Sequence, residues 1–279
     1  MQPSVRSGVL LPMRMGAVTA LVASCATPPP DPQQPTPPVP VAAPPAPVPL
    51  PTGLGEPWEP AAEWTGTGIP PKQFSLFDVP PGSPVLAYAS LDRDACEAEL
   101  RRRDIAFERA DATPGVLEPI RLLGPLHGVT AHSTVPAKLR ARSNKELIDC
   151  RLALSLDDFA ADLAAHEITG FQWTSAYRTK AELGCTAKYR GEQHCAALAV
   201  DVTSFDKRDG TRLVVVRDFH GKLGTLTCGT GEPPRNELWR IACDAAGRDF
   251  QVVLTPNWNN DHRDHLHLEL TVHPWVLVR

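Results

Sequence analysis

The chain has 279 residues, a formal net charge of −4 at pH 7, 30 prolines and seven cysteines. A nearly neutral charge without a basic stripe argues against a nucleic-acid partner. Proline dominates residues 26–60, and such a segment cannot bury a core. The remaining ~200 residues suit one folded domain.

The N-terminus has the layout of an export signal. Two arginines precede a short apolar run, and small residues follow the run and end at Cys25. This order is typical of a secretory signal peptide, and the run is too short to span a bilayer permanently. Residues 22–25 resemble the lipobox of bacterial lipoproteins. That resemblance implies cleavage after residue 24 and a lipid on Cys25; the alternative is an ordinary signal peptide with a chance cysteine.

A proline-rich tether is expected after the lipidation site. Residues 25–82 contain dense proline runs and a second Pro/Gly cluster near their end. Such chains favour extended polyproline II and act as semi-rigid spacers of about 3 Å per residue. We therefore predict a signal peptide over residues 1–24, a lipidated tether over 25–82 and a folded domain over 83–279.

Six cysteines lie beyond Cys25, and an even number behind an export signal indicates disulfides. A cysteine zinc site is disfavoured because the sequence has no CxxC pair. Six cysteines allow fifteen connectivities. Among them we favour three bridges: Cys96–Cys150, Cys185–Cys243 and Cys195–Cys228.

Three segments have helical character. Residues 92–103 carry acids early and arginines late, as the helix dipole favours. A second helix is expected to open at Ser155, which would act as its N-cap. Residues 236–246 are expected to form a third helix.

Strand-like segments lie around these helices. They are rich in β-branched residues or alternate in polarity, and they cover residues 122–135, 170–177, 197–205, 212–216, 250–254 and 265–272. Because strands and helices do not alternate regularly, the sequence predicts an α+β fold with a mainly antiparallel sheet.

The last of these segments carries metal-ligand chemistry. Residues two apart on a strand share a face, so His265, His267 and Glu269 line one side. Upstream, His194 and Asp201 lie seven residues apart, where a turn entering a strand would bring both side chains to one point. The two patterns together supply two imidazoles and a carboxylate for one divalent metal. Three protein ligands with an open position are typical of catalytic Zn²⁺ sites.

The order of these motifs resembles that of the LAS-type zinc peptidases, which include D-Ala-D-Ala carboxypeptidases and dipeptidases. More closely, residues 96–270 resemble the bacterial extensin-like C-terminal domain family. The resemblance implies a hedgehog/DD-peptidase-like fold. It rests on residues 149–154, 175–178, 201–205, 253–256 and 264–267, together with His194.

The same resemblance implies a role for each site residue. Asp264 falls at the position of the general base that takes a proton from water. Arg178 falls where a cation lies near the scissile bond or the substrate carboxylate. His265 would support the metal site or aid the tetrahedral intermediate. The zinc ligands would be His194, Asp201 and His267.

Two positions depart from the family pattern. Glu192 replaces the usual serine two residues before the first ligand, and Ala197 replaces the usual glycine three residues after it. Glu192 would alter the surroundings of the metal. Ala197 raises the question of whether the backbone there needs a glycine conformation. Neither change removes a ligand.

These features predict an exported, lipid-anchored zinc metallopeptidase that cleaves peptidoglycan peptides as a carboxypeptidase or endopeptidase. The substrate is implied by the resemblance and by export. Ala26, which follows the lipidated cysteine, resembles a signal for the outer membrane, so we expect the cell envelope, at the periplasmic face of that membrane. The alternatives are a non-catalytic envelope-binding domain with a structural metal, and an amidase acting on another polymer. An intact Asp264 favours an enzyme.

Overall fold

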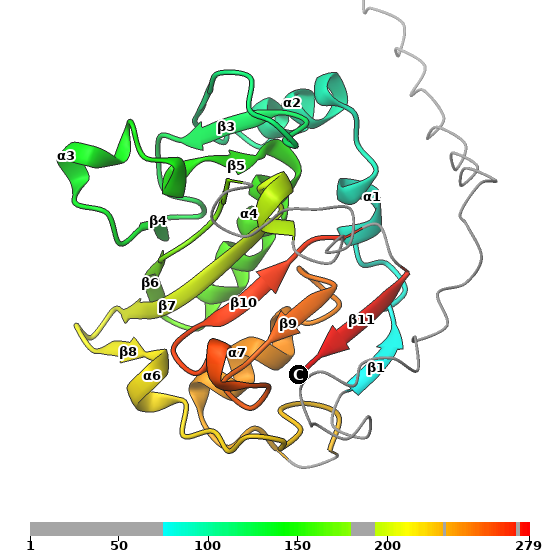
Figure 1. The fold of residues 1–279 in the computed structure, drawn as a ribbon, viewed down its shortest axis with the longest axis vertical. Coiled ribbons are helices and arrows are strands. Elements are labelled where there is room, and N and C mark those ends of the chain that lie inside the picture. Colours follow the sequence, from blue (N-terminus) through cyan, green and yellow to red (C-terminus); the bar gives the residue numbers. More distant parts are fainter. Residues whose placement is uncertain (1–74, 180–192, 231–232, 272–273) are drawn as a thin grey trace, which may run out of the picture. The chain divides into compact units, whose positions relative to one another are not determined.

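An eight-stranded mixed sheet forms the framework of the folded part (Figure 1). The structure, a computed structural model, describes residues 75–179, 193–230, 233–271 and 274–279. The strands run in the order β1-β11-β9-β10-β7-β6-β4, and β8 also pairs with β7. Their bounds are β1 Ser75–Asp78, β4 Thr130–Ser133, β6 Ile168–Trp173, β7 Ala199–Lys207, β8 Arg212–Val214, β9 Val252–Leu254, β10 Leu266–Glu269 and β11 Trp275–Val278.

Most strand pairs in this sheet are antiparallel. The pairs β4–β6 and β9–β11 are parallel, whereas those that join β1, β7, β8 and β10 to their neighbours are antiparallel. A small antiparallel sheet lies beside it, formed by β2 Phe107–Arg109, β3 Pro119–Leu122 and β5 Ile148–Asp149. The prediction of an α+β fold with a mainly antiparallel sheet is therefore confirmed.

The helices are mostly short. Those described are α1 Val85–Ala89, α2 Arg93–Arg102, α3 Ala137–Arg140, α4 Cys150–Ala165, α6 Val215–Asp218 and α7 Glu237–Ala245, with 3₁₀ turns η1 Asn144–Glu146, η3 Gln193–Ala196 and η4 Asn260–His262. None of the helices in the described ranges is long and apolar enough to cross a bilayer.

Helix α4 packs against the sheet through an aromatic cluster. The ring of Phe159 on α4 makes edge contacts with Phe171 on β6 and Phe205 on β7, at centroid distances of 5.6 and 6.4 Å. It also contacts Phe250, just before β9, at 5.5 Å. Edge-to-face pairs add about 0.5–1.5 kcal/mol to area burial. One helix residue therefore ties together three parts of the sheet.

The helices expected over residues 92–103 and 236–246 are present as α2 and α7, whereas α4 begins earlier than expected. Asp92 and Asn236 accept backbone N–H groups at the starts of α2 and α7. Helix α4 begins at Cys150 with Asp149 as its N-cap, so the expected start at Ser155 is wrong. The Asp149 side chain accepts the N–H of Arg151, and an earlier cap adds a buried turn to the helix. Ser155 lies buried inside α4.

The folded part also begins earlier than expected. Strand β1 pairs with β11 at the edge of the sheet, so Ser75–Asp78 belongs to the folded part and not to the tether predicted to run to residue 82. Both strands are only four residues long, and a short run gives little periodic signal. The predicted signal peptide and most of the predicted tether lie outside the described residues.

The disulfides confirm one predicted pair and contradict two. Cys96 on α2 bridges Cys150 at the start of α4, with Cα atoms 6.1 Å apart. Cys228 bridges Cys243 on α7 at 5.5 Å, which excludes the expected pairs Cys185–Cys243 and Cys195–Cys228. These two cysteines are only 15 residues apart in the sequence. Cys195 is also disulfide-bonded; Cys25 and Cys185 lie outside the described residues.

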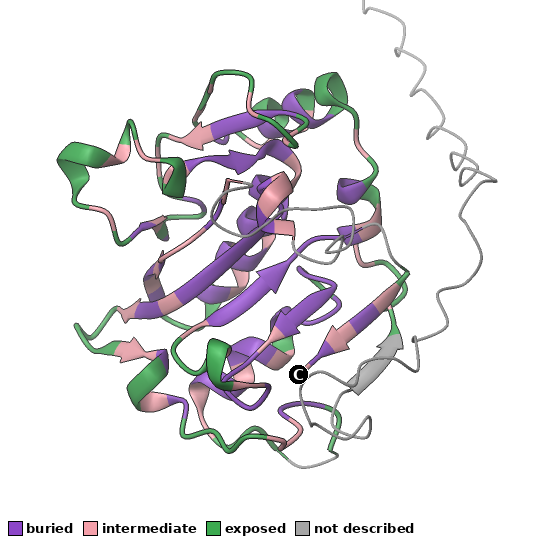
Figure 2. Cartoon of the chain, viewed as in Figure 1, coloured by how far each residue is buried: buried purple, intermediate pink, exposed green. Residues whose placement is uncertain are grey.

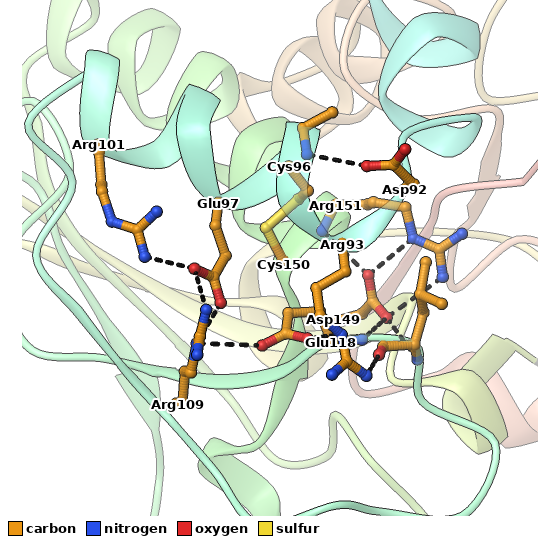
Figure 3. The surroundings of a disulfide bond; sticks show 12 residues. Asp92, Arg93, Cys96, Glu97, Arg101, Arg109, Glu118, Asp149, Cys150 and Arg151 are labelled. Atoms are coloured by element: carbon orange, nitrogen blue, oxygen red, sulfur yellow. Dashed lines mark hydrogen bonds and ion pairs between the residues drawn. A yellow bond between two sulfur atoms is a disulfide. The ribbon is translucent and has the colours of Figure 1, made fainter.

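Buried acids surround the Cys96–Cys150 bridge (Figure 3). Glu97 is 1% exposed and lies between Arg101 and Arg109, each of which donates to its carboxylate. The hydrogen bond from Arg109 is the main reason that the pKa of Glu97 falls to about 2. This buried charge is therefore paired, as burial requires.

Asp149 connects this region to the loop that leads into β7. Its fully buried carboxylate accepts the backbone N–H groups of Leu117 and Glu118 at 3.1 and 3.3 Å, and the Arg151 guanidinium at 2.8 Å. Its own N–H donates to the carbonyl of Ala197 at 2.9 Å. A single aspartate thus caps α4, holds the 117–118 loop and anchors the turn that leads into β7.

We predict that Asp149→Ala lowers the free energy of unfolding by about 3 kcal/mol or more, because it leaves the buried donors around it unpaired. The matched control is Asp209→Ala, which removes an exposed carboxylate that accepts one N–H, from Thr211. The control should lose less than about 1 kcal/mol. Chemical denaturation of the full-length variants measures both, and equal losses would contradict the anchoring role of Asp149.

Candidate metal centre

Two central strands place the first two candidate ligands side by side. In the antiparallel pair β7–β10, Asp201 lies directly opposite His267. Directly opposed residues on neighbouring strands point to the same face of a sheet. Leu266 and Leu268 point to the other face and are fully buried in the core. Figure 2 shows that the paired segments of both strands are buried.

A tight turn brings His194 to the same point. His194 lies in η3, and the turn closes through bonds from the N–H groups of Ala197 and Leu198 to the carbonyls of His194 and Gln193. Ala197 has a φ of +54°, the left-handed conformation that glycine adopts without strain. The alanine found in place of the family glycine thus keeps the glycine conformation.

The three predicted ligands converge. The Nε2 atom of His194 lies 3.1 Å from Asp201 Oδ1 and 3.2 Å from His267 Nδ1, and these last two atoms are 3.1 Å apart. All three residues are at most 5% exposed. This is the group of His, Cys, Asp and Glu side chains in the described ranges whose ligand atoms gather closely enough to hold a metal ion.

The hydrogen bonds of the two histidines fix their free nitrogens. The Nδ1 of His194 lies 2.6 Å from the carbonyl of Ala176, and a carbonyl only accepts, so Nδ1 carries the proton and Nε2 keeps its lone pair. The Nε2 of His267 lies 2.9 Å from the Glu269 carboxylate, so the neutral ring keeps its lone pair at Nδ1. Both lone pairs face Asp201. This arrangement fits a metal, since histidine ligands commonly donate their other N–H to a carboxylate or carbonyl.

Electrostatics make the metal-free cluster a site for positive charge. Burial raises the pKa of Asp201, but His194 and His267 outweigh that effect and hold it well below its usual range. Burial lowers the pKa of His267, yet hydrogen bonds to Asp201 and Glu269 outweigh it and raise the pKa to about 9. The buried imidazolium of His267 and the guanidinium of Arg178 thus offset the two carboxylates of Asp201 and Glu269. A divalent cation can supply the same compensation in place of the imidazolium.

The side chain of Arg178 pairs with Asp201, one of the candidate ligands. Its guanidinium donates to Asp201 Oδ2 and, through Nε, to Ser175 Oγ at 2.6 Å. The sequence-based expectation put this cation near a substrate. The structure places it on the outer oxygen of Asp201, where it orients the carboxylate and leaves Oδ1 turned toward the two histidines.

His265 lies nearer to the ligands than Asp264 does. The Nε2 of His265 is 3.3 Å from Asp201 Oδ1, and its Nδ1 is 2.9 Å from Asp264 Oδ1. The side chain of His265 is 13% exposed, whereas that of Asp264 is 58% exposed. The imidazole of His265 therefore lies between Asp264 and the candidate ligands.

Two residues of the site carry roles that the sequence did not assign. Glu269 orients His267. Its position two residues after His267, on the same face of the strand, could have predicted this contact from the sequence. His262 lies with its ring centroid 5.1 Å from that of His265 and 5.8 Å from that of His267. Burial, reinforced by the neighbouring histidines, lowers the pKa of His262 to about 3, so its ring is neutral.

Other histidines lie away from the centre, as expected. His127 contacts Asp157 at 3.1 Å and His132 contacts the carbonyl of Ser133 at 2.7 Å. Glu192, the second departure from the family pattern, lies outside the described residues.

Comparison with known proteins identifies the family. A family profile described as "Extensin-like protein C-terminus" matches residues 94–277, which include every residue of the candidate metal centre. No curated protein matches the chain. No solved structure matches it either. Because the profile covers well over half of the sequence, the chain belongs to the extensin-like protein C-terminus family.

Proposed function

We propose that this protein is an exported zinc metallopeptidase that hydrolyses peptide bonds of peptidoglycan, as a carboxypeptidase or an endopeptidase. The observation that carries the proposal is the convergence of His194 Nε2, Asp201 Oδ1 and His267 Nδ1 within hydrogen-bonding distance of one another. Their free lone pairs point to a common centre, and each side chain is held there by a further partner.

The donor set suits a catalytic rather than a structural metal. Structural zinc sites usually have four protein ligands, whereas catalytic sites have three and an open position. In the described part of the chain, three ligand groups gather at this point. Zn²⁺ bound there would lower the pKa of water toward 7 and polarise a substrate carbonyl.

The surrounding residues suit proton transfer. His265 presents Nε2 beside Asp201 Oδ1, from which it can take a proton from a water molecule and pass it to a leaving amine. Asp264 holds Nδ1–H and keeps the lone pair of His265 at Nε2. A histidine base oriented by a carboxylate is a common arrangement in hydrolases.

The fold type, substrate and location extend this proposal. We propose a hedgehog/DD-peptidase-like fold on the resemblance of the motif order and on the antiparallel strands that carry the ligands. Peptidoglycan follows from that resemblance and from the export signal. A lipid on Cys25 would hold the protein at the periplasmic face of the outer membrane, and the proline-rich segment would let it reach the wall.

One observation favours the alternative, an envelope-binding domain that keeps the metal for structure. Arg178, the cation expected to meet substrate, is engaged with Asp201. Incubating the zinc-loaded full-length protein with muropeptides and weighing the products separates the two functions. Loss of a residue's mass supports a carboxypeptidase, and separation of a cross-link supports an endopeptidase. Zinc binding without any turnover would favour the binding domain.

We predict that His267→Ala abolishes zinc binding and that Glu269→Gln weakens it by about 10–100-fold, because Glu269 fixes the ring of a ligand. Isothermal titration of zinc into the metal-free protein measures both. His132→Ala is the control, since its ring contacts the carbonyl of Ser133 outside the centre. If His267→Ala binds zinc as tightly as the wild type, the metal lies elsewhere.

We predict that His265→Gln keeps zinc but loses about 10²–10⁴ in the rate of muropeptide hydrolysis, as expected for loss of a general base. Asp264→Asn should keep zinc and lose less, because it acts through the ring of His265. Asp261→Asn, an exposed neighbour on η4, is the control. If Asp264→Asn loses more of the hydrolysis rate than His265→Gln does, the general base is Asp264 and not His265.

We predict that the mature protein begins at a lipidated Cys25, because residues 22–25 follow a short apolar run as in a lipobox. Mass spectrometry of the native N-terminal peptide measures this. The Cys25→Ser variant, which cannot accept the lipid, should no longer fractionate with membranes. A mature chain that begins at another residue would contradict the lipid anchor.

A further inference from the structure

His262 has a fixed tautomer with a free acceptor nitrogen. The Oδ1 of Asn259 accepts the backbone N–H groups of Asp261 and His262 at 2.9 and 3.1 Å, so this atom is the carbonyl oxygen of the amide. The same oxygen lies 2.7 Å from His262 Nδ1. Since the oxygen can only accept, Nδ1 carries the proton. The lone pair of His262 is therefore on Nε2.

The ring of His262 lies beside the candidate metal centre without belonging to it. The rings of His262 and His267 are nearly perpendicular, with an interplanar angle of 89° and centroids 5.8 Å apart, and the rings of His262 and His265 are tilted at 43° with centroids 5.1 Å apart. His262 is not among the three residues whose ligand atoms gather closely enough for a metal. Within the described residues, Nε2 has no hydrogen-bond partner, and it faces away from Asn259 because the two ring nitrogens lie on opposite sides.

The other polar groups around the centre are already engaged with one another. Arg178 donates to Asp201, and Asp264 accepts from His265. Glu269 accepts from His267. His262 thus adds an acceptor to a site whose carboxylates are committed, and a half-buried acceptor without a partner is costly unless a ligand supplies a donor.

We propose that His262 is a substrate-binding residue, whose Nε2 accepts a hydrogen bond from an N–H of the ligand held at the metal centre. The inference rests on the proposed metal site. A hydrogen bond to His262 would favour ligands that carry an N–H next to their metal-binding oxygen, such as peptide amides and hydroxamates. Esters and N-alkylated amides lack that donor and are disfavoured. A metal would bind the oxygen of ligands with or without an N–H, so a preference for ligands with an N–H would come from His262 and not from the metal.

Two hydroxamates test this preference without any assay of turnover. Acetohydroxamate carries an N–H, and N-methylacetohydroxamate replaces it with a methyl group while keeping both metal-binding oxygens. Each is titrated into the full-length protein loaded with Co²⁺, and the visible absorption of the cobalt reports binding. We expect the wild type to prefer acetohydroxamate by about three- to tenfold, the value of one hydrogen bond.

His262→Phe removes the acceptor and should abolish the difference between the two hydroxamates, whereas His262→Gln, which keeps an acceptor, should retain part of it. Comparing the preference across variants cancels the intrinsic effect of the methyl group. His132→Phe is the control and should keep the wild-type preference.

Three outcomes would overturn parts of this account separately. An equal preference in the wild type and His262→Phe, with Co²⁺ bound in both, removes the role of His262 and leaves the metal site standing. A changed or lost cobalt spectrum in both His262 variants makes His262 a metal ligand instead of a substrate contact. Failure of the wild type to bind Co²⁺ overturns the proposed metal centre itself.

Discussion

The carboxylate of Asp201 is the interaction on which the site depends. It is 1% exposed and touches four basic groups: His194, His265 and His267 through Oδ1, and Arg178 through Oδ2. A buried charge is tolerated only when it is paired and hydrogen-bonded. Arg178 and, without a metal, the His267 imidazolium meet that requirement. The three imidazoles around Oδ1 define the geometry of the site.

The scaffold holds this carboxylate from two directions. The β7–β10 pairing fixes Asp201 opposite His267, and regular strands give little freedom to a side chain packed against a core. The turn that carries His194 is less regular, and it is held through Ala197 by the backbone of Asp149. Gly115 packs against this turn so closely that a Cβ would lie 2.6 Å from the carbonyl oxygen of Cys195. The position of the candidate ligand His194 therefore depends on contacts with residues that are distant in the sequence.

The sequence was sufficient where local periodicity decides the outcome. Alternation along a strand put His267 and Glu269 on one face, and the spacing of His194 and Asp201 predicted their meeting. Sequence patterns were not sufficient to predict features that depend on contacts between residues distant in the sequence. No local pattern shows that Arg178 pairs with Asp201, because the two residues are 23 positions apart and meet only through the fold.

The start of α4 and the disulfide pairs show the same limit. Ser155 and Asp149 are both good N-cap residues, and the choice of Asp149 follows from its contacts with the 117–118 loop and Arg151. Cys228 pairs with Cys243, 15 residues away in the sequence, and not with the partner expected for either cysteine. Neither choice could be read from spacing, because several alternatives have equal local support.

The most direct test of the account is a crystal structure of the protein grown with zinc, with anomalous scattering measured above and below the zinc absorption edge. We expect one strong anomalous peak about 2.0–2.2 Å from His194 Nε2, Asp201 Oδ1 and His267 Nδ1. A peak coordinated by other residues, or no peak at this centre in the presence of excess zinc, would contradict the central claim.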